Sequence, residues 1–275
     1  MKSRDSARKA WLRLALGLAL TPCAVGLVAT LFSDSHVRQG FADVVVYSGG
    51  ALLPVLGLGL AATCEAPLAF AFAVAGMCGL AILTLTLTRV AQGHLAAPMI
   101  VDTTLVALAW ALGSALGRRV QHASHLLPAC VVAACADLAS VLSPEGPSHA
   151  IAESDRALSV LATWFPEPGT HAVGPALGVG DLLFMALVFG VARAHALPYA
   201  RTICMCLLGT ALAGAAAAAF GVAVPALPAI ALCVLVGLPA ARQLRPVDRK
   251  AARWSMIIAG SVAVATIARN FLLRS

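Results

Sequence analysis

Gly178-Val179-Gly180-Asp181 lies inside an apolar run, Val173 to Ala192, that contains no other acidic residue. The run is long enough to cross a bilayer as a helix, so we expect Asp181 to lie within the hydrocarbon layer. A carboxylate at that depth costs about 2.5–3.5 kcal/mol on insertion scales, and acids retained there usually have a function. The two glycines remove side chains beside Asp181 and so allow another backbone to approach it closely.

The composition is that of a multi-pass membrane protein. The chain has 275 residues, of which 60% are hydrophobic and 11% are charged, and its mean hydropathy is +0.91. Apolar runs of about 20 residues recur along it, and helices are the spans that satisfy their own backbone groups in lipid. We therefore predict an all-α bundle of about nine transmembrane helices. The predicted spans cover residues 14–32, 41–62, 67–88, 97–117, 124–142, 173–192, 201–221, 224–241 and 254–273.

The spans fall into three parts: N-terminal helices in 1–123, a core that carries two buried acids in 124–241, and a basic loop with a final helix in 242–275. The small residues of 209–219 predict close helix packing in lipid. The long acidic loop 143–172 has apolar residues at helical spacing, which favour a short amphipathic helix at the membrane surface. These are Ile151, Leu158, Leu161 and Phe165.

Lysine and arginine concentrate in alternate loops. If the N-terminus is inside, the inner segments hold 14 of the 19 basic residues, and positive loops face the cytoplasm. The charge pattern therefore predicts a cytoplasmic N-terminus and an outer C-terminus. It also accounts for the net charge of +7 without a nucleic-acid partner. The inner segments are 1–13, 63–66, 118–125, 193–201 and 241–253.

Metal chemistry is not indicated. The eight cysteines lie in or beside apolar runs, and none forms a Cys-x-x-Cys pair, so we interpret them as small core residues. His122 and His125 lie in a basic turn that lacks the further ligands a zinc site needs. We expect no metal and no organic cofactor.

Asp137 is the second acid deep in a predicted span. It lies seven residues before Pro144, and Asp181 lies seven residues after Gly174, which is about 10 Å of helix in each case. The two spans are antiparallel, so the carboxylates should reach the same depth. A carboxylate pair that shares one proton can activate water and protonate a carbonyl oxygen at the same time. This is the chemistry of aspartyl hydrolysis.

Val224-Pro225-Ala226-Leu227-Pro228 opens the eighth predicted span. Its two prolines lack backbone donors, so the segment cannot be a regular helix throughout. Irregular backbone at membrane depth is tolerated where it is buried in protein or lines a wet cavity. Such a segment is able to hold an extended peptide by main-chain hydrogen bonds.

The three segments, in this order, resemble those of the presenilin and signal peptide peptidase family of intramembrane aspartyl proteases. Gly178-Val179-Gly180-Asp181 resembles its Gly-x-Gly-Asp motif and Pro225-Ala226-Leu227 its Pro-Ala-Leu motif, while 137–147 resembles the segment that begins at the first catalytic aspartate. The resemblance implies catalysis by Asp137 and Asp181. It also implies substrate binding by Gly178, Val179, Gly180, Pro225, Ala226 and Leu227.

The resemblance further implies transmembrane helices as substrates. We expect a prokaryotic cell membrane as the location, and the short termini and lack of an extramembrane domain favour action without accessory subunits. One residue departs from the pattern, because Ala136 stands where the family has tyrosine. Three alternatives stay open: a prepilin peptidase-like enzyme, an inactive member that only binds helices, and a proton-coupled transporter or channel. In the last, the buried acids form a relay that Asp102 joins.

Overall fold

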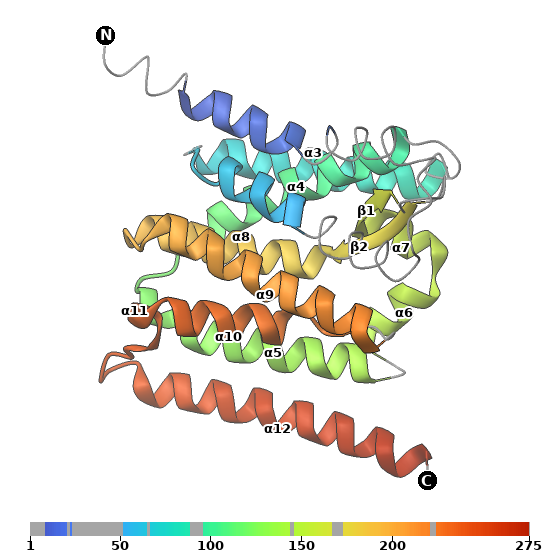
Figure 1. The fold of residues 1–275 in the computed structure, drawn as a ribbon. Coiled ribbons are helices and arrows are strands. Elements are labelled where there is room, and N and C mark those ends of the chain that lie inside the picture. The colour runs from blue at the N-terminus through green and yellow to red at the C-terminus, as the bar shows by residue number, and fades with distance from the viewer. Residues whose placement is uncertain are drawn as a thin grey trace.

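The structure is a computed structural model, and the chain is described over residues 9–20, 23, 52–64, 67–88, 96–143, 146–166, 173–220 and 224–274. Most of these residues are helical (Figure 1). The first two predicted spans, 14–32 and 41–62, lie largely outside the described residues. Their described parts are helical over 9–20 and Leu52–Ala61.

The remaining elements follow in chain order. They are α3 (Leu68–Thr88), α4 (Ala96–Gly117), the 3₁₀ helix η1 (Ala123–His125), α5 (Leu126–Leu142), α6 (Pro147–Glu153), α7 (Asp155–Leu161), β1 (Ala162–Pro166), β2 (Val173–Gly178), α8 (Val179–Ala194), α9 (Tyr199–Phe220), α10 (Leu227–Gly237), α11 (Pro239–Arg242) and α12 (Arg249–Arg274).

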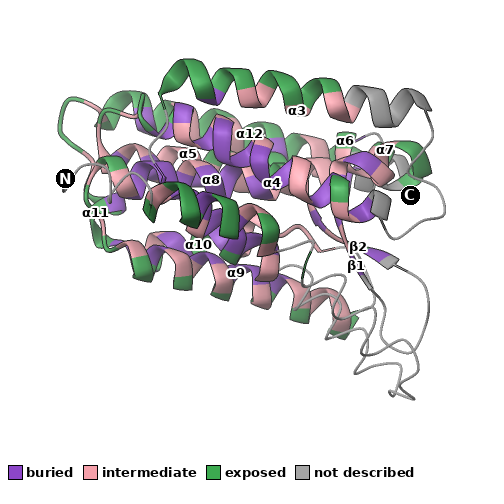
Figure 2. Cartoon of the chain, turned by 90° about the horizontal axis from the view of Figure 1, so that it is seen from above, coloured by how far each residue is buried: buried purple, intermediate pink, exposed green. Residues whose placement is uncertain are grey.

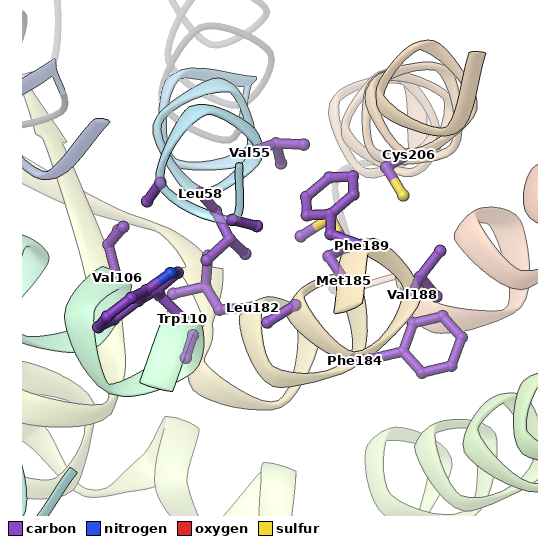
Figure 3. Close-up of a cluster of buried hydrophobic side chains, with 14 of the residues drawn as sticks. Val55, Leu58, Val106, Trp110, Leu182, Phe184, Met185, Val188, Phe189 and Cys206 are labelled. Atoms are coloured by element: carbon purple, nitrogen blue, oxygen red, sulfur yellow. The ribbon is translucent and has the colours of Figure 1, made fainter. Parts of the chain in front are cut away.

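The long helices lie roughly side by side in one bundle, in the spatial order α3, α4, α8, α9, α10, α5 and α12 (Figure 1). Helix α8 lies at the centre, and α3 and α12 lie on the outside with largely exposed surfaces (Figure 2). A helix that is apolar on every side is suited to such a central place. Its side chains pack against those of the Leu52–Ala61 helix, α4 and α9 (Figure 3).

Glycine lets α4 and α8 approach until their backbones touch. A Cβ atom added at Gly113 would lie 2.2 Å from the Cβ of Ala186, and one at Gly117 would lie 2.6 Å from the Gly190 backbone. The predicted close packing of 209–219 is confirmed at Gly209, where an added Cβ would lie 2.4 Å from the Cα of Ile230. In lipid, such contacts supply much of the association energy between helices.

Four described helices are long and apolar enough to cross a membrane: Pro98–Gly117, Ala123–Leu142, Tyr199–Phe220 and Arg249–Arg269. The predicted all-α fold needs one correction. Residues 173–178, predicted as the start of a transmembrane helix, form strand β2, which pairs with β1 in an antiparallel hairpin. Gly174 and Pro175 oppose helix at this point.

The loop 143–172 also differs from the prediction of a single amphipathic helix. It forms two short helices, α6 and α7, and Phe165 lies in strand β1. The side chain of Ser154 caps α7 by accepting the N–H of Ala157 at 3.3 Å, which ends one helix and starts the next. The hairpin, α6 and α7 therefore close one end of the bundle (Figure 1).

The opposite end gathers described parts of the predicted inner segments. The Arg193 guanidinium donates to the carbonyl of Ala62 at 2.8 Å, and His195 Nε2 lies 2.8 Å from the carbonyl of Val120. Arg245 hydrogen-bonds His122. The bundle thus has a basic end and a hairpin end.

Candidate functional site

Helix α5 carries Asp137 five residues before its end, facing the segment that precedes α10. The backbone N–H of Leu227 donates to Asp137 Oδ2 at 3.0 Å, and the Ala226 N–H also faces this carboxylate. Pro225 and Pro228 have no N–H, so the two amides between them are the donors that this short segment offers. The irregular backbone predicted from the prolines is present, since α10 begins only at Leu227.

Asp181 lies in the first turn of α8, directly after the hairpin. Gly178 ends β2 and is the N-cap residue of α8, and a Cβ added there would lie 3.4 Å from Asp181 Oδ2. A Cβ added at Gly180 would meet no described atom within 4 Å. Asp181 and Asp137 line the same cavity, and a carboxylate opposes the ionisation of another carboxylate near it.

Both acids line a single cavity of about 310 Å³ at the hairpin end of the bundle. Its wall comes from α5, the α6–α7 segment, the start of β1, β2 with the start of α8, α9, and the backbone before α10. The lining residues are Asp137, Val141, Ser148, Ile151, Leu158, Leu161, Ala162, Pro175, Ala176, Leu177, Gly178, Val179, Gly180, Asp181, Thr210, Ala213, Gly214, Ala217, Val224, Pro225 and Ala226.

The cavity wall is largely apolar; besides the two carboxylates it holds the hydroxyl-bearing residues Ser148 and Thr210. On α9 its wall consists of small residues at i, i+3, i+4 and i+7, which is one face of a helix. These are Thr210, Ala213, Gly214 and Ala217. On the opposite side, apolar side chains of α6 and α7 cover the acids. A peptide with apolar side chains fits this surface, and the acid pair is the polar group that it would meet.

The structure brings together seven of the eight site residues predicted from the sequence. Gly178, Val179, Gly180, Pro225 and Ala226 line the cavity with the two aspartates. Leu227 does not line it; its backbone N–H orients Asp137 instead, and its side chain packs on the core.

Ala136, the residue that departs from the resemblance noted in the sequence, does not line the acid-lined cavity. It is exposed and lines a second hollow of about 290 Å³ between α5 and α12, together with Thr266 and Arg269. We call this space the α5–α12 hollow. A larger side chain at position 136 would therefore enter the α5–α12 hollow and not the acid-lined cavity.

Ser148 has a structural role that no sequence motif indicates. Its N–H donates to Ser140 Oγ at 2.8 Å, and the two hydroxyl oxygens lie 2.7 Å apart. Ser140 lies one turn beyond Asp137 on α5, so this pair fixes α6 against the helix that carries the first acid. The Ser148 side chain also faces the acid-lined cavity.

Among the described residues, no three His, Cys, Asp or Glu side chains are grouped to hold a metal ion. His122 and His125 lie in or beside η1, which packs against α11 at the basic end. The chain matches no protein-family model, and no curated protein is significantly similar to it.

Proposed function

We propose that this chain is an intramembrane aspartyl endopeptidase that cuts peptide bonds within transmembrane helices of other proteins. The observation that supports it most strongly is the cavity in which Asp137, Asp181 and the Pro225-Ala226 backbone meet. These residues come from three segments far apart in the sequence. If one of these acids had only a structural role, there would be no reason for the second acid and the Pro225-Ala226 backbone to lie beside it.

In the proposed reaction the two aspartates share one proton. One takes a proton from water as the water attacks the peptide carbonyl, and the other protonates the carbonyl oxygen. The proton equilibria belong to the pair rather than to either residue. The N–H of Leu227, 3.0 Å from Asp137 Oδ2, holds that carboxylate in one orientation. No step needs a metal or an organic cofactor.

The substrate must unwind locally, because a helix buries the carbonyls that water has to attack. Strand β2 pairs only with β1 in the described chain, and Pro175 to Gly178 line the cavity beside Asp181. An unwound peptide can add to this edge, as in other cases of strand addition. The small residues on α9 leave space for its side chains.

We further propose nine transmembrane spans in a prokaryotic cell membrane, with the basic end in the cytoplasm. Positive loops face inward, and the described basic segments lie at one end of the bundle. The acid-lined cavity is built partly by the hairpin and the α6–α7 segment, which close the other end. Cleavage then takes place nearer the outer face of the membrane, and the C-terminus lies outside.

The test compares the wild-type protein with Asp137→Asn and Asp181→Asn, each reconstituted with a single-span reporter helix. The matched control is Glu153→Gln, which replaces an exposed acid of α6. Losing a general acid or base lowers rates about 10²–10⁴-fold, so both variants should lose cleavage at this scale while Glu153→Gln cuts normally. Cleavage retained by either aspartate variant refutes the pair mechanism.

A second measurement separates the protease from a proton relay. A peptide with a hydroxyethylene group in place of the scissile bond mimics the tetrahedral intermediate, and transition-state mimics bind proteases far more tightly than substrates do. It should bind the wild-type protein in detergent and bind at least 100-fold more weakly to both aspartate variants. If the hydroxyethylene peptide binds the wild-type protein, Glu153→Gln and both aspartate variants equally weakly, the result favours the proton relay.

A further inference from the structure

Asp102 lies in the second turn of α4 and is fully buried, although it is outside the acid-lined cavity. Its Oδ1 accepts the backbone N–H of Trp164 at 2.8 Å, and its Oδ2 has no hydrogen-bond partner in the described structure. A buried carboxylate with a single partner is costly, so the contact it makes needs an explanation.

Trp164 is the strand residue next to an irregularity in the hairpin. Thr163 pairs with Leu177, but Trp164 pairs with Pro175, so Ala176 is an extra residue on β2. This is a β-bulge, which bends a strand and redirects its side chains. The Trp164 amide at this point donates to α4 rather than to β2. Asp102 therefore ties the bulge to a helix of the bundle.

The bulge shapes the surface that faces the acids. In a regular strand, consecutive side chains point to opposite faces, yet Pro175, Ala176 and Leu177 all line the cavity. Ala176 also packs against Phe165, which lies beside Met99 of α4. The strand then runs through Gly178 directly into α8 and Asp181. A change in the backbone conformation at the bulge therefore also displaces Asp181, which lies only a few residues further along the chain.

We propose that Asp102 is a positioning residue that fixes the bulge, and through it selects which peptide bond of a bound strand lies opposite Asp137 and Asp181. The second half of this proposal rests on the proposed protease function. A slip of one residue moves a strand by about 3.3 Å and turns every side chain to the other face. A loosened bulge should therefore spread cleavage over neighbouring bonds rather than only slow it.

The test uses Asp102→Ala and Asp102→Asn. The asparagine amide oxygen can still accept the Trp164 N–H, whereas alanine cannot. The control is Thr104→Val on the same helix, because the Thr104 hydroxyl bonds only the Ile100 carbonyl of its own helix, at 2.7 Å. Two quantities are measured: amide hydrogen exchange over 162–166 and 173–178, and the masses of the two cleavage products.

Asp102→Ala should raise exchange in the hairpin at least tenfold and yield products cut at several adjacent bonds. Asp102→Asn and Thr104→Val should keep wild-type exchange and one dominant product pair. Should Asp102→Ala fail to accumulate, Asp102→Leu repeats the test with a side chain of the same branched shape that accepts no hydrogen bond.

If the hairpin amides of Asp102→Ala and Asp102→Leu exchange at the wild-type rate, Asp102 does not hold the bulge in place. Raised exchange with an unchanged cleavage position refutes the control of register. If the wild-type protein cuts no substrate, the protease function fails, while the exchange measurement still decides whether Asp102 holds the bulge.

Discussion

Replacing Gly113 by alanine should push α8 away from α4 and so displace Asp181. The added Cβ would lie 2.2 Å from Ala186 Cβ, 2.4 Å from its carbonyl carbon and 2.8 Å from its Cα. Backbone atoms cannot rotate away as a long side chain can. Carbon atoms in contact need about 3.5–4.0 Å, so the two helices must separate by roughly 1 Å or more.

Two free-energy terms oppose each other in this variant. Alanine favours helix over glycine by about 1 kcal/mol, while overpacking a well-packed core costs about 1–3 kcal/mol. The same propensity gain without a clash is available at Gly79 on α3, where an added Cβ meets no described atom within 4 Å. We expect Gly79→Ala to keep or increase stability and Gly113→Ala to lower it.

The effect on catalysis should exceed the effect on stability. Ala186 lies five residues after Asp181, or about 7.5 Å along α8. A displacement of the helix backbone at Ala186 therefore also moves Asp181. A misplacement of about 1 Å at a catalytic group can cost about 10²-fold in rate. Gly113→Ala should therefore accumulate in the membrane yet cleave a single-span reporter roughly 100-fold more slowly than Gly79→Ala.

The assay compares both variants in one detergent, by initial cleavage rate and by thermal unfolding. If Gly113→Ala cleaves and unfolds like Gly79→Ala, then α4 and α8 do not pack backbone to backbone as described. A loss of stability without any loss of rate would show instead that α8 moves without displacing Asp181.

Two further variants test the surroundings of the acids. Gly180→Leu should leave unfolding unchanged, because a Cβ there meets nothing within 4 Å, but it should reduce reporter cleavage at least tenfold by filling the cavity; normal cleavage would place the substrate elsewhere. Ala136→Tyr should accumulate and cleave as the wild-type protein does, since its ring enters the α5–α12 hollow of about 290 Å³; a marked gain or loss of rate would mean that this position acts on the dyad.

Hydropathy predicted the helices well, because burial in lipid demands long apolar runs whatever their detailed packing. It failed at Val173–Gly178, where an apolar run is a strand. Apolar content alone does not separate a buried strand from a helix segment. The available signals were the breakers Gly174 and Pro175 and the aromatic pair Trp164-Phe165 of β1.

The order of the three motifs along the chain was a better guide to the candidate site than the depth of the two acids calculated from helix geometry. Equal depth follows from a helical rise of about 1.5 Å per residue between Gly174 and Asp181. Most of that segment is strand instead, which rises about 3.3 Å per residue. The acids nevertheless line one cavity. The Ser140–Ser148 pair and the contact between Asp102 and Trp164 join residues with no local sequence signature, so only the folded chain reveals them.

The two acids share a feature that explains why the helices beside them are short. Asp181 lies in the first turn of α8, and Asp137 accepts an N–H from the first residue of α10. Helix N-termini carry unpaired N–H groups and partial positive charge, which suit carboxylates.

To bring those termini to the acids, α8 and α10 must begin inside the bundle rather than at its surface. They have only 16 and 11 residues, fewer than the roughly 20 that cross a bilayer. The hairpin and the Val224–Ala226 backbone occupy the remaining depth, and such irregular backbone is tolerated because it lines a cavity. A count of helices long enough to cross a bilayer therefore leaves out the two helices whose N-termini lie beside the acids.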